Sequence, residues 1–361
     1  MRSVGPPAPL THAPLPVALL LPGQGAQQEG MARGLYGNEP SFTEAVDEVF
    51  ELLGTEGDRI RDDWAADRPT VPLDHVSRAQ PLLFTVDYAL GRMLFDWGIR
   101  PAVLLGHSAG EAAAAALAGV FSLPDAVRLL AERVELIGQA PPGGMLAVAA
   151  TPDEVAPHLR EGVVVGAVNS PAQLLLAGPE PALSETAGAV RAAGFTCVRA
   201  KATVGFHSPS LARVCARQVP SFAAVRRNPP AIPLLSAYTA TELTTAQAAD
   251  PWFWAMQPAE PVLFGPALDQ LLTDGPYQLV ETGPGQSLSA LARRHRGVTS
   301  GGSRVLGLLT ARPCGPERDR WTVLKAAEQL AAGGQFADPD TLSRLRVRLS
   351  GDDRSRFEAR A

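Results

Sequence analysis

Residues 102–119 read AVLLGHSAGEAAAAALAG, and this stretch decides the fold. It opens with an apolar run typical of a buried strand, and the alanines after Glu111 have high helix propensity. Gly106 and Gly110 flank Ser108 and allow the chain to turn sharply between strand and helix. A strand, a tight turn and a helix around Gly-X-Ser-X-Gly predict a nucleophilic serine in an α/β fold.

The segments on either side of this stretch predict further strands and helices of the same sheet. An apolar run at 17–21 ends at Pro22-Gly23, and another strand ends at Gly283-Pro284-Gly285, a usual place for active-site loops in open α/β folds. Strands that alternate with helices predict a parallel sheet covered on both faces. We predict helices at 41–53, 81–97, 125–139 and 261–272, and strands at 17–21, 102–105, 232–236 and 277–281.

Between residues 143 and 206 the predicted elements become shorter and follow the order βαββαβ, which is that of a ferredoxin-like unit. We therefore expect a hydrolase-like parallel-sheet domain, made of residues 15–142 and 207–315, with a ferredoxin-like subdomain inserted at 143–206. Residues 1–14 read as a disordered lead-in, and residues 316–361 as one helix at 321–331 with a charged tail. The elements predicted in the insert are 145–150, 152–160, 163–168, 173–177, 181–193 and 195–201.

Composition excludes several classes of function. The net charge of -5 and the isoelectric point near 5.7 give no reason to expect nucleic acid or an anionic membrane as a partner. The three cysteines show no disulfide framework and no metal-ligand spacing, so we expect no metal and a reducing, cytoplasmic environment. No apolar run approaches the roughly 20 residues of a membrane span, and the run near the N-terminus is too short for a signal peptide.

A serine nucleophile needs a base, usually histidine, within hydrogen-bonding reach. His12 lies in the lead-in, His75 and His158 lie in polar segments, and His107 faces away from Ser108 on an extended strand end. Two candidates remain on the residues alone. His207 lies in a loop at the exit of the insert, and His295 lies among three arginines, where positive charge would lower its pKa.

Arg133 lies inside the apolar stripe of the helix predicted at 125–139. On a helical wheel it falls at the centre of the side that holds the leucines and Ile137, so its guanidinium must find an anion there. That anion is either a core carboxylate, in a structural ion pair, or the carboxylate of a substrate held by two parallel hydrogen bonds.

Three motifs together resemble the acyltransferase family of malonyl-CoA:acyl-carrier-protein transacylases and polyketide synthase acyltransferase domains. They are Pro22-Gly23-Gln24-Gly25-Ala26-Gln27, Gly106-His107-Ser108-Ala109-Gly110-Glu111 and Phe206-His207-Ser208. The resemblance extends from about residue 16 to about residue 312 and implies the same hydrolase-like fold with a ferredoxin-like insert. It selects His207 as the base, and we expect a free-standing, trans-acting member.

The resemblance also implies roles for other residues. The backbone N–H groups of Gln24 and Ala109 would form the oxyanion hole, and the backbone carbonyl of Gln257 would orient His207. Gln80 would line the acyl site. Arg133 would hold the free carboxylate of a malonyl-type group.

The residues before His207 bear on the acyl group. This chain has Val204-Gly205-Phe206-His207, where malonyl-selective synthases have HAFH and methylmalonyl-selective ones YASH. Phe206 would crowd an α-methyl branch and so favours malonyl, whereas Val204 and Gly205 would leave extra room.

The resemblance implies transfer of a malonyl-type group from acyl-CoA to the phosphopantetheine thiol of an acyl carrier protein, in polyketide or fatty-acid biosynthesis. The intermediate would be an ester on Ser108, and no bound cofactor is implied. Two alternatives stay open. One is transfer of an unusual acyl group delivered by another carrier protein, and the other is an editing hydrolase of acyl thioesters.

Overall fold

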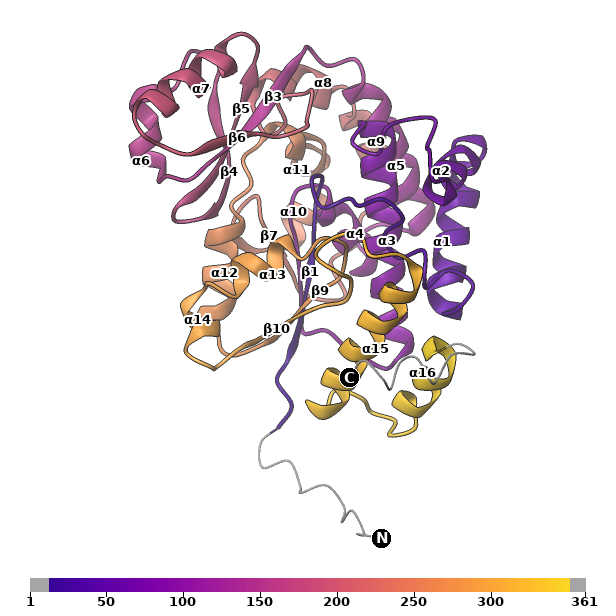
Figure 1. Cartoon of the computed structure of the whole chain (residues 1–361). Helices are drawn as coiled ribbons and strands as arrows, with labels where there is room; N and C mark the ends of the chain where they lie inside the picture. Colours follow the sequence, from indigo (N-terminus) through magenta and orange to yellow (C-terminus); the bar gives the residue numbers. More distant parts are fainter. Residues whose placement is uncertain (1–12, 351–361) are drawn as a thin grey trace.

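The computed structural model describes residues 13–350 and contains two sheets (Figure 1). The larger sheet has six strands in the order β10-β9-β1-β2-β7-β8. Its first five strands are parallel, and β8 at the edge runs antiparallel to β7. The strands are β1 (Val17–Leu21), β2 (Val103–Gly106), β7 (Leu234–Ser236), β8 (Thr241–Glu242), β9 (Gln278–Glu281) and β10 (Arg304–Gly307).

Alternate side chains of β1 enter two different cores, as expected for a parallel sheet buried on both faces. Leu19 and Leu21 pack with helices of one face, namely α1 (Pro40–Leu53), α3 (Val76–Asp96), α4 (Gly110–Leu117) and α5 (Leu123–Ile137). Ala18 and Leu20 pack on the other face with α12 (Phe264–Thr273) and α13 (Ser287–Ala292). This confirms the predicted α/β fold with a mostly parallel sheet.

The smaller sheet is antiparallel and has the order β4-β5-β3-β6. Its elements follow one another as βαββαβ, which is the ferredoxin-like order predicted from the sequence. They are β3 (Gly143–Val148), α6 (Pro152–Val155) continued by η1 (Ala156–His158), β4 (Val164–Ser170), β5 (Gln173–Pro179), α7 (Ala182–Ala192) and β6 (Cys197–Arg199). In Figure 1 this unit lies at the upper left, beside the carboxyl ends of the larger sheet.

The C-terminal segment differs from the prediction of one helix and a charged tail. It contains two helices, α15 (Pro316–Ala332) and α16 (Thr341–Ser350), which lie side by side at the lower right of Figure 1. Leu345 and Leu349 of α16 are buried in the same core as α1 and α3. Alternating arginines hide this helix in the sequence, because only one narrow stripe of it is apolar.

The remaining helices are short or polar. They are α2 (Thr55–Ala65), η2 (Pro209–Leu211), α8 (Ala212–Ala216), α9 (Val219–Ala224), α10 (Thr245–Ala249), α11 (Pro251–Met256), η3 (Gln257–Ala259) and α14 (Arg296–Thr299). No helix between residues 13 and 350 combines the length and the apolar content that a bilayer span requires. The predicted lead-in falls almost entirely on residues 1–12, outside the described part of the chain, as does His12.

Candidate active site

Ser108 lies in the tight turn between β2 and α4. Its φ is 53°, a left-handed conformation that is uncommon for a residue other than glycine. The turn closes only because both flanking residues lack a side chain. A Cβ atom at Gly106 would overlap the backbone of Glu111, and one at Gly110 would overlap the carbonyl oxygens of Leu21 and Pro22. The two glycines therefore allow the tight turn that was predicted around Ser108. This turn, from Gly106 to Gly110, is called the elbow below.

His207 is the base candidate that reaches Ser108. Its Nε2 atom lies 2.6 Å from Ser108 Oγ, and its Nδ1 atom lies 2.8 Å from the backbone carbonyl oxygen of Glu260. Because a carbonyl oxygen only accepts, Nδ1 carries the proton and Nε2 is free to accept one from the serine hydroxyl.

Burial keeps His207 neutral. It is the largest cause that lowers the pKa of His207 to about 4, and the charges of His107 and Arg133 act in the same direction. Hydrogen bonds to the Glu260 and Gln257 backbone act the opposite way. At neutral pH the imidazole is therefore an unprotonated base.

The carbonyl nearest to His207 Nδ1 is that of Glu260, whereas the prediction named Gln257, whose backbone makes the smaller contribution to the pKa of His207. The Gln257 carbonyl already accepts the N–H of Glu260 at 3.2 Å, across the η3 turn. Glu260 follows that turn in an extended conformation, which leaves its own carbonyl available to His207. The buried Gln257 side chain donates instead to Glu111 at 3.2 Å.

Two other histidines, His295 and His107, have hydrogen-bond partners away from Ser108. His295 Nε2 lies 2.7 Å from Asp269 Oδ1, at the surface between α12 and α14. His107 Nε2 lies 2.8 Å from Asn169 Oδ1 of β4, so this side chain joins the elbow to the smaller sheet. The choice left open between His207 and His295 is therefore decided by geometry.

The loop after β1 lies directly against the elbow. A Cβ atom at Gly23 would be 3.1 Å from Ser108 Cβ and 3.3 Å from the backbone nitrogen of Ala109. Gln24 and Ala109, the residues predicted to supply the oxyanion hole, are thus on neighbouring backbone segments. Ala109 is also the N-cap of α4, whose N-terminus favours negative charge.

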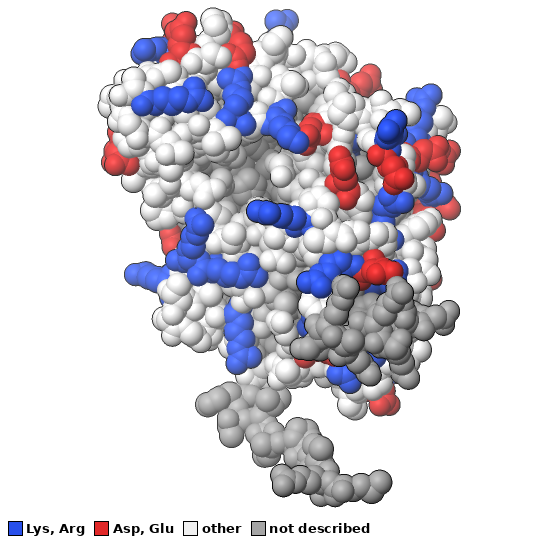
Figure 2. Space-filling view, in the orientation of Figure 1, with Lys and Arg blue, Asp and Glu red and all other residues white. Residues whose placement is uncertain are grey.

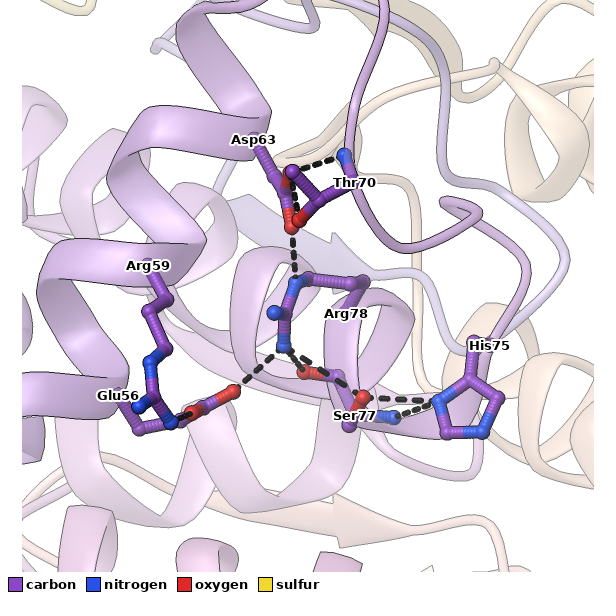
Figure 3. A network of polar contacts seen from close by, with 7 residues as sticks. All are labelled: Glu56, Arg59, Asp63, Thr70, His75, Ser77 and Arg78. Carbon is purple, nitrogen blue, oxygen red and sulfur yellow. Dashed lines mark hydrogen bonds and ion pairs between the residues drawn. The ribbon is translucent and has the colours of Figure 1, made fainter.

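Gln80 lies on α3 and meets this loop, because its side-chain amide donates to Gln24 Oε1 at 3.1 Å. A partly buried ion-pair network fixes the first turns of the same helix (Figure 3). In it, Arg78 lies 2.6 Å from Asp63 and 2.6 Å from Glu56, both on α2. The network holds the helix that presents Gln80.

Arg133 lies on α5 on the buried side predicted for it. Its guanidinium donates to Gln218 Oε1 at 3.2 Å and to the Trp254 carbonyl at 2.7 Å, and it lies 5.5 Å from the ring centre of Phe222. Among residues 13–350 no carboxylate forms an ion pair with it, so the structural pair considered from the sequence is not found. Within this part of the chain the arginine is a half-buried cation whose hydrogen-bond partners are all neutral.

A cavity of about 410 Å³ opens beside Ser108 and His207. Phe206 and Gln80 line it, together with Met145 and Leu175 of the smaller sheet. Val204 does not line this cavity and packs in an apolar cluster with Ile137, Cys215 and others.

The extra room expected at Gly205 is filled. A Cβ atom there would lie 3.0–3.2 Å from the Gly178 backbone. This segment therefore does not widen the cavity beside Ser108.

Two residues of the site had no predicted role. Glu111 is fully buried; it accepts hydrogen bonds from Ser236 and Gln257, and burial raises its pKa to about 8, so it is neutral at pH 7. Tyr238 follows β7, and its ring centre lies 6.1 Å from that of His207. The rule that loops at carboxyl ends of parallel strands form sites could have identified Tyr238.

Comparisons with known proteins agree on one family. Residues 19–305 match the model for the acyl transferase domain. The chain is 35% identical over 322 residues to a phenolphthiocerol/phthiocerol polyketide synthase protein of Mycobacterium tuberculosis, covering 89% of this chain and 22% of that protein. It is 37% identical over 285 residues to the spectinabilin polyketide synthase system protein NorB of Streptomyces orinoci, covering 77% of this chain and 13% of that protein. The chain thus spans less than a quarter of the length of each of these two relatives.

Solved structures agree with these matches. The acyltransferase domain from the second module of the salinomycin polyketide synthase superposes with a TM-score of 0.82 at 34% identity, covering 94% of this chain and 78% of that one. The acyl transferase domain of SpnD, in complex with 2-(pent-4-yn-1-yl)malonyl, gives 0.83 at 31%, covering 91% and 78%. FabD from Acinetobacter baumannii, at 23% identity and a TM-score of 0.77, covers 89% and 99% and shares the fold.

Proposed function

This chain belongs to the acyl transferase domain family, and from that premise we propose that it carries a malonyl-type acyl group between two thioesters. The donor is a coenzyme A thioester, the acceptor is the phosphopantetheine thiol of an acyl carrier protein, and the intermediate is an ester on Ser108. The observation that carries the proposal is the 2.6 Å contact between Ser108 Oγ and a neutral His207.

In the loading step, His207 Nε2 accepts the hydroxyl proton of Ser108 while Oγ attacks the thioester carbonyl carbon. A tetrahedral oxyanion forms, and the N–H groups of Gln24 and Ala109 stabilise it, each by roughly 3 kcal/mol. When the carbon–sulfur bond breaks, His207 returns the proton to the coenzyme A thiolate. The acyl group remains as an ester on Ser108.

The transfer step repeats this chemistry in reverse. His207 accepts the proton of the carrier protein's thiol, and the sulfur attacks the ester carbonyl. The carbon–oxygen bond to Ser108 then breaks, and His207 protonates the serine oxygen. Because coenzyme A leaves before the carrier protein reacts, the kinetics are of the ping-pong type.

Arg133 supports the choice of a carboxylated acyl group. Its positive charge lowers the pKa of His207 and that of Tyr238. Its present partners are an amide oxygen and a backbone carbonyl, both neutral. A substrate carboxylate would supply the missing anion and would be held by charge-assisted hydrogen bonds.

The test of this proposal compares acyl transfer from malonyl-CoA and acetyl-CoA to a carrier protein that carries phosphopantetheine. Arg133→Ala should lower kcat/KM for malonyl-CoA by roughly 10- to 100-fold, as expected for a lost hydrogen bond to a charged group, and change that for acetyl-CoA little. Arg128→Ala, an exposed position on the same helix, is the control and should resemble the wild type.

The acceptor is examined in the same assay. Acylated carrier protein would support transfer, whereas free malonate formed equally fast with and without the carrier protein would make the chain a hydrolase. If Arg133→Ala lowers kcat/KM equally for malonyl-CoA and acetyl-CoA, Arg133 does not bind the carboxylate of the substrate.

A further inference from the structure

The mouth of the acyl cavity carries two cationic side chains. Arg199 at the end of β6 and Lys201 just after it line the cavity that has Ser108 and His207 at its base. Figure 2 shows Lys and Arg side chains on both sides of the hollow between the upper and lower parts of the molecule. These positive charges contrast with the net charge of -5 of the whole chain.

Both side chains reach solvent and have one carboxylate partner each. Lys201 donates to Asp74 at 2.7 Å and its side chain is 80% exposed. Asp74 in turn accepts from Gln27, in the loop that also contains Gln24, at 2.8 Å. Arg199 forms an ion pair with Glu180 and its side chain is 38% exposed.

These partners use only part of the donor capacity at the mouth. A lysine ammonium has three N–H donors and an arginine guanidinium five. Within the described residues, the side-chain partners found are Asp74 for Lys201 and Glu180 for Arg199. The mouth thus offers several exposed N–H donors beside a cavity whose base holds the nucleophile.

We propose that Arg199 and Lys201 form a phosphate-recognition site at this mouth, which binds the phosphate at the outer end of a pantetheine arm. The inference rests on the proposed function, since a thioester placed at Ser108 would extend its arm outward through the cavity. Charge-assisted hydrogen bonds to phosphate oxygens would then compete with Asp74 for Lys201. The same chemistry occurs in coenzyme A and in the phosphopantetheine of a carrier protein.

Binding measurements test the site without depending on which acyl group is transferred. Coenzyme A, 4′-phosphopantetheine and pantetheine are titrated calorimetrically into Ser108→Ala protein and into the same protein with Arg199→Ala and Lys201→Met added. The two added changes should raise the Kd for coenzyme A and 4′-phosphopantetheine by about tenfold or more and leave that for pantetheine unchanged. The matched control is Arg191→Ala, an exposed arginine of α7 in the same subdomain.

The three ligands distinguish the two possible sources of the phosphate, which are the pantetheine phosphate and the nucleotide phosphates of coenzyme A. Weaker binding of both coenzyme A and 4′-phosphopantetheine supports the inference. It assigns the site to the phosphate that coenzyme A shares with the carrier protein. Weakening of coenzyme A alone would overturn it, because the nucleotide phosphates of the donor would then be the ligand. Equal Kd values with and without the Arg199 and Lys201 changes, or an equal loss for pantetheine, would also overturn it. If these ligands bind as expected but Ser108 of the wild type is not acylated, the proposed function fails and the phosphate site stands.

Discussion

Ser108 and His207 both have left-handed backbone conformations, with φ of 53° and 62°. Such conformations cost on the order of 1–3 kcal/mol each for residues other than glycine and persist only where the surroundings enforce them. The elbow glycines enforce the first. The second is held by the His207 N–H, which donates to the Pro258 carbonyl at 2.7 Å. Backbone strain thus falls on both of the residues whose side chains meet in the site.

The low pKa of His207 predicts an unusual pH profile for acylation of Ser108. The base acts when unprotonated, so the rate should be flat between about pH 6 and pH 8 and should fall only as the pH approaches the pKa of about 4. Single-turnover acylation by malonyl-CoA, followed in rapid-quench experiments across this range, measures the profile.

The control is circular dichroism at each pH, which separates loss of base from loss of fold. A midpoint near 6.5, the ordinary value for histidine, would show that His207 is not desolvated as described.

For single residues, the sequence indicated candidate side chains of the site more readily than candidate backbone atoms. Ser108, His207 and Arg133 stand out because each has a side chain whose chemistry or position is unusual for its surroundings. The Glu260 carbonyl has no such signal, because every residue carries one and only the path of the chain after η3 selects it. The roles of Gln24, Ala109 and Gln80 stay predictions.

Among the elements, the turn from β2 into α4 is the most sharply constrained by packing. Gly110→Ala would drive a methyl group into the backbone of Leu21 and Pro22, so it should move Ser108 and abolish most acylation. We expect a lower melting temperature as well, which differential scanning fluorimetry would measure.

Gly188→Ala on α7 is the matched control. No atom lies within 4 Å of the added methyl group there, so the change should be neutral or stabilise by about 0.4–1 kcal/mol, as for other glycine to alanine changes in compatible conformations. Normal acylation by Gly110→Ala would contradict the geometry of the elbow.

Elements with clear periodicity were predictable, and those that depend on distant contacts were not. The apolar run of β1 and the βαββαβ order of the smaller sheet are both seen in the structure. Helix α2 escaped prediction because most of its side chains are polar and only a few, including Ile60 and Trp64, are buried. Strand β10 has just Leu306 and Gly307 buried, so its place in the sheet comes from pairing with β9.

At the scale of the whole molecule, the C-terminal helices are part of the main core. Leu345→Ala on α16 should lower the free energy of unfolding by about 2–5 kcal/mol, because the leucine is 1% exposed and packs in the core that includes α1 and α3. Val347→Ala on the same helix is the control, since Val347 is 66% exposed and should change stability little.

Urea denaturation followed by tryptophan fluorescence would measure both variants. Equal stability of the two would mean that α16 does not pack on the core.

The central claim is that Ser108 carries the acyl group, and intact-protein mass spectrometry tests it most directly. The protein is incubated with malonyl-, methylmalonyl- and acetyl-CoA and compared with Ser108→Ala. We predict a mass increase of one malonyl group with malonyl-CoA in the wild type, none in Ser108→Ala, and loss of the group when a phosphopantetheinylated carrier protein is added. An adduct that persists in folded Ser108→Ala, or no adduct with any of the three esters, would contradict the account.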